Sequence, residues 1–168
     1  MLYKCLGAFF LLLAGGYLSV FFNRMERRRL QVLDAYIALI RYIKGQIDCY
    51  AMPMEEILTR ADPHLLRTCM GQGRTYLHDK DEPVLYLPFH EMVTESRLYL
   101  EPESERLLSA FARELGQTYR HEQVMRCEHY IQALGEERRK LSETAPIRVR
   151  MNSILCLCCA LGVAVVLW

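Results

Sequence analysis

The sequence has almost no net charge, with 21 lysine and arginine residues against 20 aspartate and glutamate residues. Lys4 is the one basic residue outside residues 23–150, and that stretch holds all the acidic residues, so its charges balance. Proteins that bind nucleic acid present a broad basic face to the phosphates. The charge balance of residues 23–150 therefore argues against a nucleic-acid partner.

The sequence also lacks the short motifs of several enzyme and cofactor classes. There is no G-x-x-x-x-G-K-[ST] loop for nucleotide phosphates, and Gly71-Gln72-Gly73 predicts a simple turn. The group Cys156, Cys158 and Cys159 has no second pair and no nearby histidine to complete a metal site. We therefore expect no catalytic residues, no cofactor and no metal, and we assign no role beyond packing to these three cysteines.

Long apolar runs are present, and they lie at the two ends. Leu6 to Phe22 and Asn152 to Trp168 are each 17 residues long and carry no charge. A bilayer core needs ~20 apolar helical residues, with a lower limit of about 17. We predict transmembrane helices over 5–22 and 151–168. A cleaved signal peptide at the first run and a buried core helix at the second are the alternatives.

Six arginines flank these runs on their inner sides and predict the topology. Because basic residues near a span stay in the cytoplasm, residues 23–150 should be cytoplasmic and both termini outside. Cys49, Cys69 and Cys127 would then be reduced thiols. We predict that the six side chains set the topology and face lipid headgroups: Arg24, Arg27, Arg28, Arg29, Arg148 and Arg150.

The region between the spans shows the three-and-four spacing of amphipathic helices. One apolar stripe runs from Leu30 to Ile47, and it predicts a long helix that continues the first span and ends at Cys49 to Pro53. Another runs from Val124 through Cys127 to Leu141 and predicts a helix closed by Ser142 to Pro146. We predict short helices between them, with residues 71–100 open. The fold class is all-α, a cytoplasmic helical bundle between two transmembrane helices in a hairpin.

The histidines do not suggest an active site. His121, Cys127 and His129 are read as helix-surface residues, because positions 127 and 129 point about 200° apart on a helix. A membrane-anchored enzyme remains the rival interpretation, and a pocket that gathered His64, His78 and His90 would support it.

The order of features resembles the stage III sporulation protein AB family across essentially the whole chain. The matching features are Leu6-Gly7-Ala8 in the first span, the arginine-bearing exit, and a proline soon after Tyr50. They continue with the Phe111 to Gly116 element, the helix from Gln123 onward, and the C-terminal span. The sequence departs from the family pattern at Gln46-Ile47 and at Met52-Pro53-Met54.

The resemblance implies a non-enzymatic platform or scaffold subunit in the mother-cell membrane that faces the forespore. It implies membership of a secretion-like channel complex and similarity to the platform proteins of type II secretion and type IV pilus systems. The implied partners are a cytoplasmic secretion-type ATPase and other membrane subunits, and self-association is left open. A general secretion or pilus platform is the alternative. Our hypothesis places ATPase contacts at seven residues: Arg41, Lys44, Asp48, Tyr50, Pro53, Glu55 and Glu56.

Overall fold

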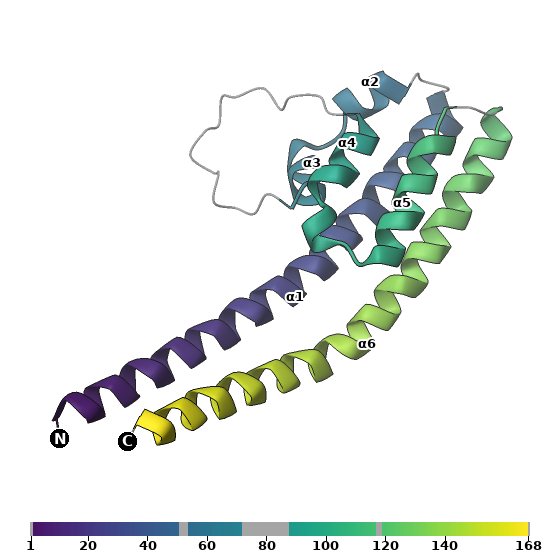
Figure 1. Cartoon of the computed structure of the whole chain (residues 1–168). Coiled ribbons are helices and arrows are strands. Elements are labelled where there is room, and N and C mark those ends of the chain that lie inside the picture. Colours follow the sequence, from purple (N-terminus) through teal and green to yellow (C-terminus); the bar gives the residue numbers. More distant parts are fainter. Residues whose placement is uncertain (1, 51–53, 72–87, 117–118, 168) are drawn as a thin grey trace. The chain divides into compact units, whose positions relative to one another are not determined.

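A computed structural model describes residues 2–50, 54–71, 88–116 and 119–167 of the chain. Within these ranges it describes the side chains of all residues except 2–14, 50, 54, 55, 157, 160, 161 and 163–167. The described ranges are helical and contain no strand, which confirms the all-α class. The elements are α1 (Leu2–Tyr50), α2 (Met54–Thr59), α3 (Pro63–Cys69), α4 (Phe89–Glu95), the 3-10 turn η2 (Arg97–Tyr99), α5 (Pro102–Glu114) and α6 (Arg120–Leu167) (Figure 1).

The chain divides into two units, which we call the helical unit and the paired-end unit. The helical unit is residues 28–140, and the paired-end unit combines residues 1–27 with residues 141–168. Among the described residues, no helix contains a stretch both long and apolar enough to cross a membrane. Much of the predicted spans 5–22 and 151–168 falls on residues whose side chains lie outside the described part. Both spans stay predictions.

Local sequence signals explain where the short helices begin and end. Asp62 caps α3 by accepting a hydrogen bond from the His64 amide at 2.9 Å, and Pro63 occupies the first turn. Such a cap stabilises a helix by about 1 kcal/mol. Gly71 follows α3 with φ +67° and Gly116 follows α5 with φ +83°, a backbone conformation that glycine adopts without a steric penalty.

The predicted stripe on α1 is buried, and the buried face is wider than the stripe. Leu33, Ile40 and Ile43 are almost fully buried, and Tyr36 and Leu39 between them are buried as well. Tyr36 contacts Phe89 of α4, so α4 as well as α6 covers part of α1. On α6, the predicted Cys127, Leu134 and Leu141 are also buried.

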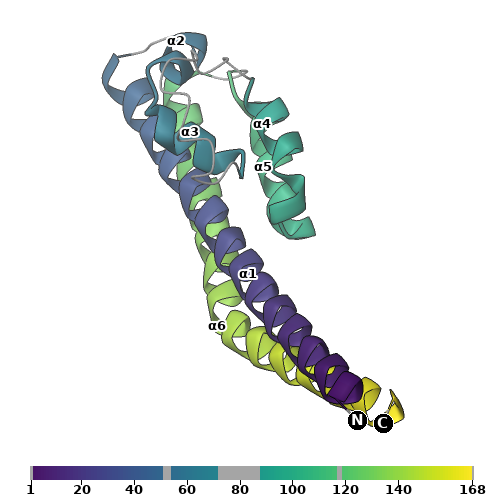
Figure 2. The same cartoon turned by 90° about the vertical axis from the view of Figure 1, so that its left-hand side faces the viewer.

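Four aromatic rings connect the helices of the helical unit. Tyr36 on α1 meets Phe89 on α4 at 5.8 Å between centroids, Phe89 meets Phe111 on α5 at 5.2 Å, and Phe111 meets Tyr130 on α6 at 5.3 Å. All three contacts are edge-to-face, and each such pair contributes about 0.5–1.5 kcal/mol beyond its buried area. The core is therefore continuous from α1 to α6. Figures 1 and 2 both show α4 alongside α5.

One boundary prediction was wrong. Ser142 to Pro146 does not close the last helix, because α6 continues through Pro146 to Leu167. A proline inside a helix removes one backbone hydrogen bond and costs about 3 kcal/mol. Helix α6 has 48 residues, and the hydrogen-bonded turns before and after Pro146 keep the chain helical in spite of this cost. The Thr144 hydroxyl adds a local bond by donating to the Leu141 carbonyl at 3.3 Å.

Candidate interaction surfaces

The structure links two of the predicted docking residues on α1 to α6. The Lys44 ammonium pairs with the Glu128 carboxylate, and Asp48 lies 3.7 Å from the guanidinium of Arg120. Arg41 is exposed on α1. Lys44 and Asp48 therefore already hold partners within the chain, and their side chains contribute to the seam between the two long helices.

The remaining docking residues are placed only in part. Glu56 is half-buried on α2, and its carboxylate pairs at 2.6 Å with Arg60, which directly follows that helix. Tyr50 ends α1 and Glu55 lies in α2, but the side chains of both are outside the described part, as is Pro53 altogether. The structure thus brings Lys44 and Asp48 together with α6, whereas Glu56 pairs with a residue only four positions later in the chain.

Sequence reasoning missed two exposed apolar side chains near the start of α6. Tyr119 is 89% exposed and Met125 is 54% exposed, next to the Asp48–Arg120 pair and the Glu122–Arg126 pair respectively. Met125 falls outside the apolar stripe of α6, and that off-stripe position is the sequence signal that could have revealed it.

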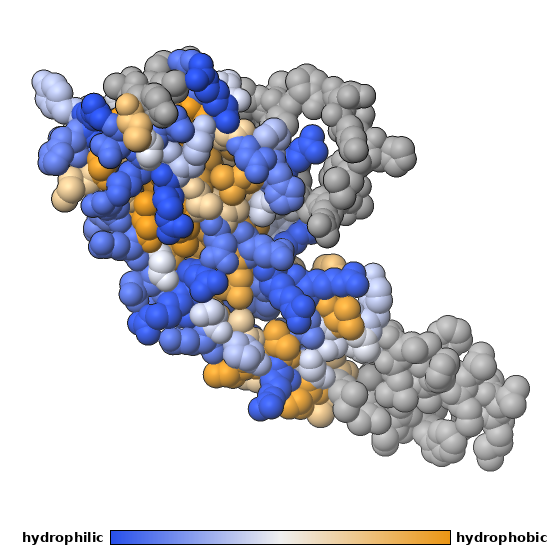
Figure 3. Space-filling view, turned by 180° about the vertical axis from the view of Figure 1, so that it is seen from behind, coloured by the Kyte–Doolittle hydropathy of each residue, from blue (hydrophilic) through white to orange (hydrophobic). Residues whose placement is uncertain are grey.

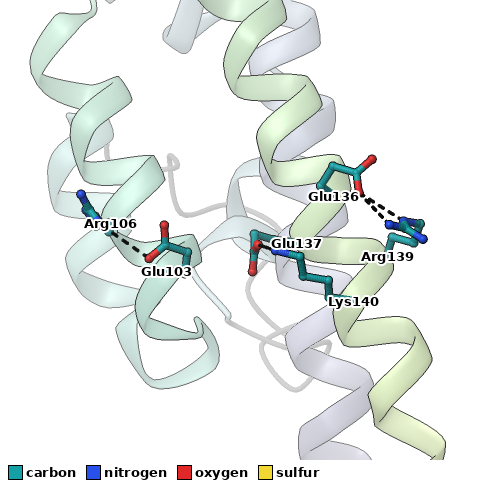
Figure 4. Close-up of polar contacts among 6 residues, drawn as sticks. All are labelled: Glu103, Arg106, Glu136, Glu137, Arg139 and Lys140. Atoms are coloured by element: carbon teal, nitrogen blue, oxygen red, sulfur yellow. Dashed lines mark hydrogen bonds and ion pairs between the residues drawn. The ribbon is translucent and has the colours of Figure 1, made fainter.

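The α5 and α6 helices also carry ion pairs between residues three positions apart, in which at least one side chain is exposed. Figure 4 shows three of them: Glu103–Arg106 at 3.8 Å, Glu136–Arg139 at 3.0 Å and Glu137–Lys140 at 2.5 Å. The hydrogen bond to Glu137 is the main cause that raises the pKa of Lys140, and the charges of Glu137, Glu136 and Glu103 add to it. Exposed pairs of this kind contribute little to stability.

In the paired-end unit, polar side chains meet between the two helices and apolar side chains are exposed. The Ser19 and Ser153 hydroxyls lie 2.7 Å apart across the helix pair, and both residues are half-buried, as is Asn23. Figure 3 shows apolar side chains exposed on the described part of α1 and α6 in this unit. The exposed large apolar residues here are Tyr17, Leu18, Val20, Phe21, Phe22, Ile147, Met151, Ile154 and Leu155.

The six predicted lipid-facing arginines fall into two groups. Arg24, Arg27 and Arg150 are exposed, and Arg148 is half-buried. Arg28 and Arg29 belong to the helical unit and contact other residues of it instead. The Arg28 guanidinium lies 5.4 Å from the ring centre of Tyr99, and Arg29 pairs with Glu101 at 3.1 Å.

The candidate metal and catalytic residues form no cluster among the described residues. His64 and His90 are each exposed, and His78 lies outside the described part. His121 and His129 are exposed as predicted, but Cys127 is buried, which corrects its surface placement. Burial raises the pKa of the Cys127 thiol to about 11. No group of three metal-ligating side chains is found within the described residues.

Two long helices joined through short ones, with an aromatic core and charged outer faces, define an all-helical bundle protein. A family model for stage III sporulation protein AB matches residues 4–168, so the chain belongs to this family and is a sporulation protein. No curated protein and no solved structure matches the chain.

Proposed function

We propose that the protein is a non-enzymatic membrane platform subunit of the channel complex between mother cell and forespore. In this role the paired-end unit lies in the mother-cell membrane as a hairpin, and the helical unit docks a secretion-type ATPase in the cytoplasm. The observation that carries the proposal is the exposure pattern of the paired-end unit. Its apolar side chains face outward, while Ser19 and Ser153 pair with each other.

The exposure pattern supports a lipid environment for physical reasons. In water, side chains such as Phe21 and Leu155 would leave large apolar areas in contact with solvent, at about 25 cal/mol per Å². In lipid these side chains are solvated by acyl chains, and a hydrogen bond between helices satisfies polar groups that lipid cannot. The exposed Arg24, Arg27 and Arg150 border this surface and suit anionic headgroups.

The docking part of the proposal concerns the end of α1 and the start of α2. The helical unit is rich in charged surface residues, and this surface together with membership of a sporulation family supports the interpretation as a platform. The exposed Arg41 and the half-buried Glu56 are the described residues at which a partner gains charge contacts. Other membrane subunits of the complex would contact the apolar exterior of the paired-end unit.

Two alternatives differ in what supports them. A general secretion or pilus platform shares the proposed architecture, but membership of a sporulation family favours the forespore channel. A pocket that gathered His64, His78 and His90 would favour a membrane-anchored enzyme; His64 and His90 are exposed, and His78 lies outside the described residues. Neither alternative has a specific contact in its favour.

Affinity purification after cross-linking tests the proposed role. A tagged full-length chain is recovered from membranes of cells that are forming endospores, and we expect a cytoplasmic ATPase and further membrane subunits with it. Recovery of the chain alone, or with soluble metabolic enzymes, would contradict the platform role.

Charge reversal tests the docking surface. We expect Glu55→Lys/Glu56→Lys, and to a lesser degree Glu56→Lys alone, to reduce recovery of the ATPase while the membrane level of the protein stays the same. Glu122→Lys is the matched control, because Glu122 pairs with Arg126 four residues later, as Glu56 does with Arg60. Equal recovery with Glu56→Lys, the double variant and the control would refute the assignment of the surface.

A further inference from the structure

Within the paired-end unit, helix α6 carries a line of exposed apolar side chains. Its members follow one another at steps of four, three and four residues, and we call them the α6 stripe: Ile147, Met151, Ile154 and Cys158. Ser153, whose hydroxyl bonds to Ser19 of α1, and the half-buried Asn152 lie on another face of the helix. The α6 stripe is therefore separate from the contact that joins α6 to α1.

The spacing of the α6 stripe distinguishes a partner helix from a lipid surface. Steps of four and three residues average about 3.5 residues, which is the period at which one line of side chains keeps facing a neighbouring helix. Contact with acyl chains needs apolar side chains but no such period. The regular spacing of the exposed residues therefore favours a second helix as the occupant of this face.

The α6 stripe leads to a place where two backbones can approach closely. Gly162 follows Cys158 by four residues and is exposed, and a Cβ added to Gly162 would meet no described atom within 4 Å. Small residues four positions apart are enriched where membrane helices pair, because they let the helices come close together. The open space at Gly162 can accept another helix.

Charged residues of opposite sign flank the α6 stripe near its first residue. With Met151 at position a of a heptad repeat, Glu143 falls at position g and Arg148 at position e. In a parallel pair of helices, position g of one chain faces position e of the next heptad in the other chain, so Glu143 would face Arg148 of the second copy. An antiparallel pair would place like charges together. The charges therefore favour a parallel pair.

We propose that the α6 stripe binds a second copy of this chain, in a parallel pair with twofold symmetry. In such a pair, each residue of the stripe lies next to the same residue of the other copy, so the two Cys158 thiols meet. Two copies that enter one membrane with the same topology are parallel, which agrees with the charge pattern. This inference rests on the proposed membrane insertion of the paired-end unit and adds the partner that covers one of its faces.

Disulfide cross-linking in bilayers tests the proposal. The purified full-length chain is reconstituted into vesicles of phosphatidylcholine and phosphatidylglycerol, oxidised with copper phenanthroline and separated on a non-reducing gel. We expect a disulfide-linked dimer in the wild type and loss of most of it in Cys158→Ala. Cys158→Ala/Ile154→Cys should restore the dimer, because position 154 belongs to the α6 stripe. Cys158→Ala/Tyr17→Cys is the matched control, since Tyr17 is an exposed apolar residue of α1 in the same unit, and it should not restore the dimer.

The outcomes separate this inference from the proposed function. An undiminished dimer in Cys158→Ala, equal dimer yields with the cysteine at positions 154 and 17, or no dimer in any variant would overturn the inference. Flotation of the same vesicles after alkaline carbonate treatment reports membrane insertion. A chain that stays with the vesicles but forms no stripe-specific dimer contradicts the inference alone, whereas a chain that carbonate releases contradicts membrane insertion and the inference together.

Charge exchange tests the parallel orientation with Cys158 left in place. Glu143→Arg should lower the yield of the Cys158 dimer, because two arginines would then face each other. Glu143→Arg/Arg148→Glu should restore the yield, because opposite charges face each other again. A single variant that cross-links like the wild type would overturn the parallel pair. So would a double variant that stays as low as the single one while circular dichroism shows the same helix content.

Discussion

At the scale of single residues, Tyr99 depends on a position that only glycine can occupy. A Cβ built on Gly71 would lie 2.3 Å from two ring carbons of Tyr99, and the Gly71 backbone has φ +67°. The Arg28 guanidinium also lies over this ring, 5.4 Å from its centre. Gly71 thus has two separate reasons to be glycine: the conformation of its backbone and the close approach of the ring.

We expect Gly71→Ala to lower the free energy of unfolding by at least about 1–2 kcal/mol, from the left-handed backbone alone. Gly45→Ala is the control, because Gly45 lies inside α1 with no atom within 4 Å of an added Cβ. There we expect a gain of about 0.5–1 kcal/mol from helix propensity. Urea unfolding of the detergent-solubilised chain, followed by circular dichroism, measures both. Equal effects of the two substitutions would contradict the tight packing at Tyr99.

A buried hydrogen bond connects Tyr36 to α4. The Ser96 hydroxyl donates to the Val93 carbonyl at 3.1 Å, so its oxygen is left to accept from the Tyr36 hydroxyl at 2.8 Å. Burial raises the pKa of Tyr36 well above its ordinary value, although the hydrogen bond to Ser96 opposes this. The neutral phenol is therefore the form that the core accepts.

At the scale of elements, α1 and α6 of the helical unit are antiparallel partners with a defined register. Asp34 pairs with Arg138, Lys44 with Glu128 and Asp48 with Arg120. Residue numbers rise along α1 as they fall along α6, which is the signature of antiparallel helices. The apolar stripes predicted both helices, but the choice of facing residues arises from contacts between residues far apart in the sequence.

The Asp34–Arg138 pair should show measurable coupling in a double-mutant cycle. Two guanidinium nitrogens of Arg138 donate to the two oxygens of Asp34, at 2.8 and 3.3 Å. Since the pair is about half exposed, we expect a coupling of about 0.5–1 kcal/mol with alanine substitutions, decreasing as salt is added. The Asp48–Arg120 pair, at 3.7 Å, is the control and should couple more weakly. Stronger coupling of the control pair would refute this ranking.

Helix existence was predictable from the sequence, whereas some helix boundaries were not. The end of α1 at Tyr50 agrees with the predicted stop before Pro53. Pro146 was misleading, because the local penalty of proline does not reveal how many turns continue on both sides. The short helix α4 was not predicted, since its residues mix aromatic and charged side chains. Phe89 acquires its role only by packing between Tyr36 and Phe111.

At the scale of the whole molecule, the two units follow opposite rules. The helical unit buries apolar side chains and exposes charges, whereas the paired-end unit exposes apolar side chains. The core of the helical unit also contains buried ionisable groups. Burial raises the pKa of Cys69, Cys127 and Tyr36, so each group is neutral in the folded state.

We therefore expect stability to fall in alkaline solution. The unfolded chain loses the Cys127 proton near its ordinary pKa of 9.0, and the folded chain retains it up to about 11, so stability decreases as the pH rises through this range. Urea unfolding at about pH 7 and about pH 10.5 measures the loss. The loss should be smaller in Cys127→Ala than in the wild type, and unchanged in Cys49→Ala, whose thiol is exposed. An equal loss in all three proteins would contradict the role of Cys127.

The sequence by itself determined the helical class, the balanced charge of residues 23–150 and the apolar character of both ends. These properties depend on composition and on spacing within one helix, and both can be read along the chain. Only the tertiary structure decided that Tyr36 reaches Tyr130 through two phenylalanines, that Arg28 holds Tyr99, and that Lys44 and Asp48 pair with α6. Each of these contacts joins residues distant in the sequence, so packing selects them and local periodicity cannot.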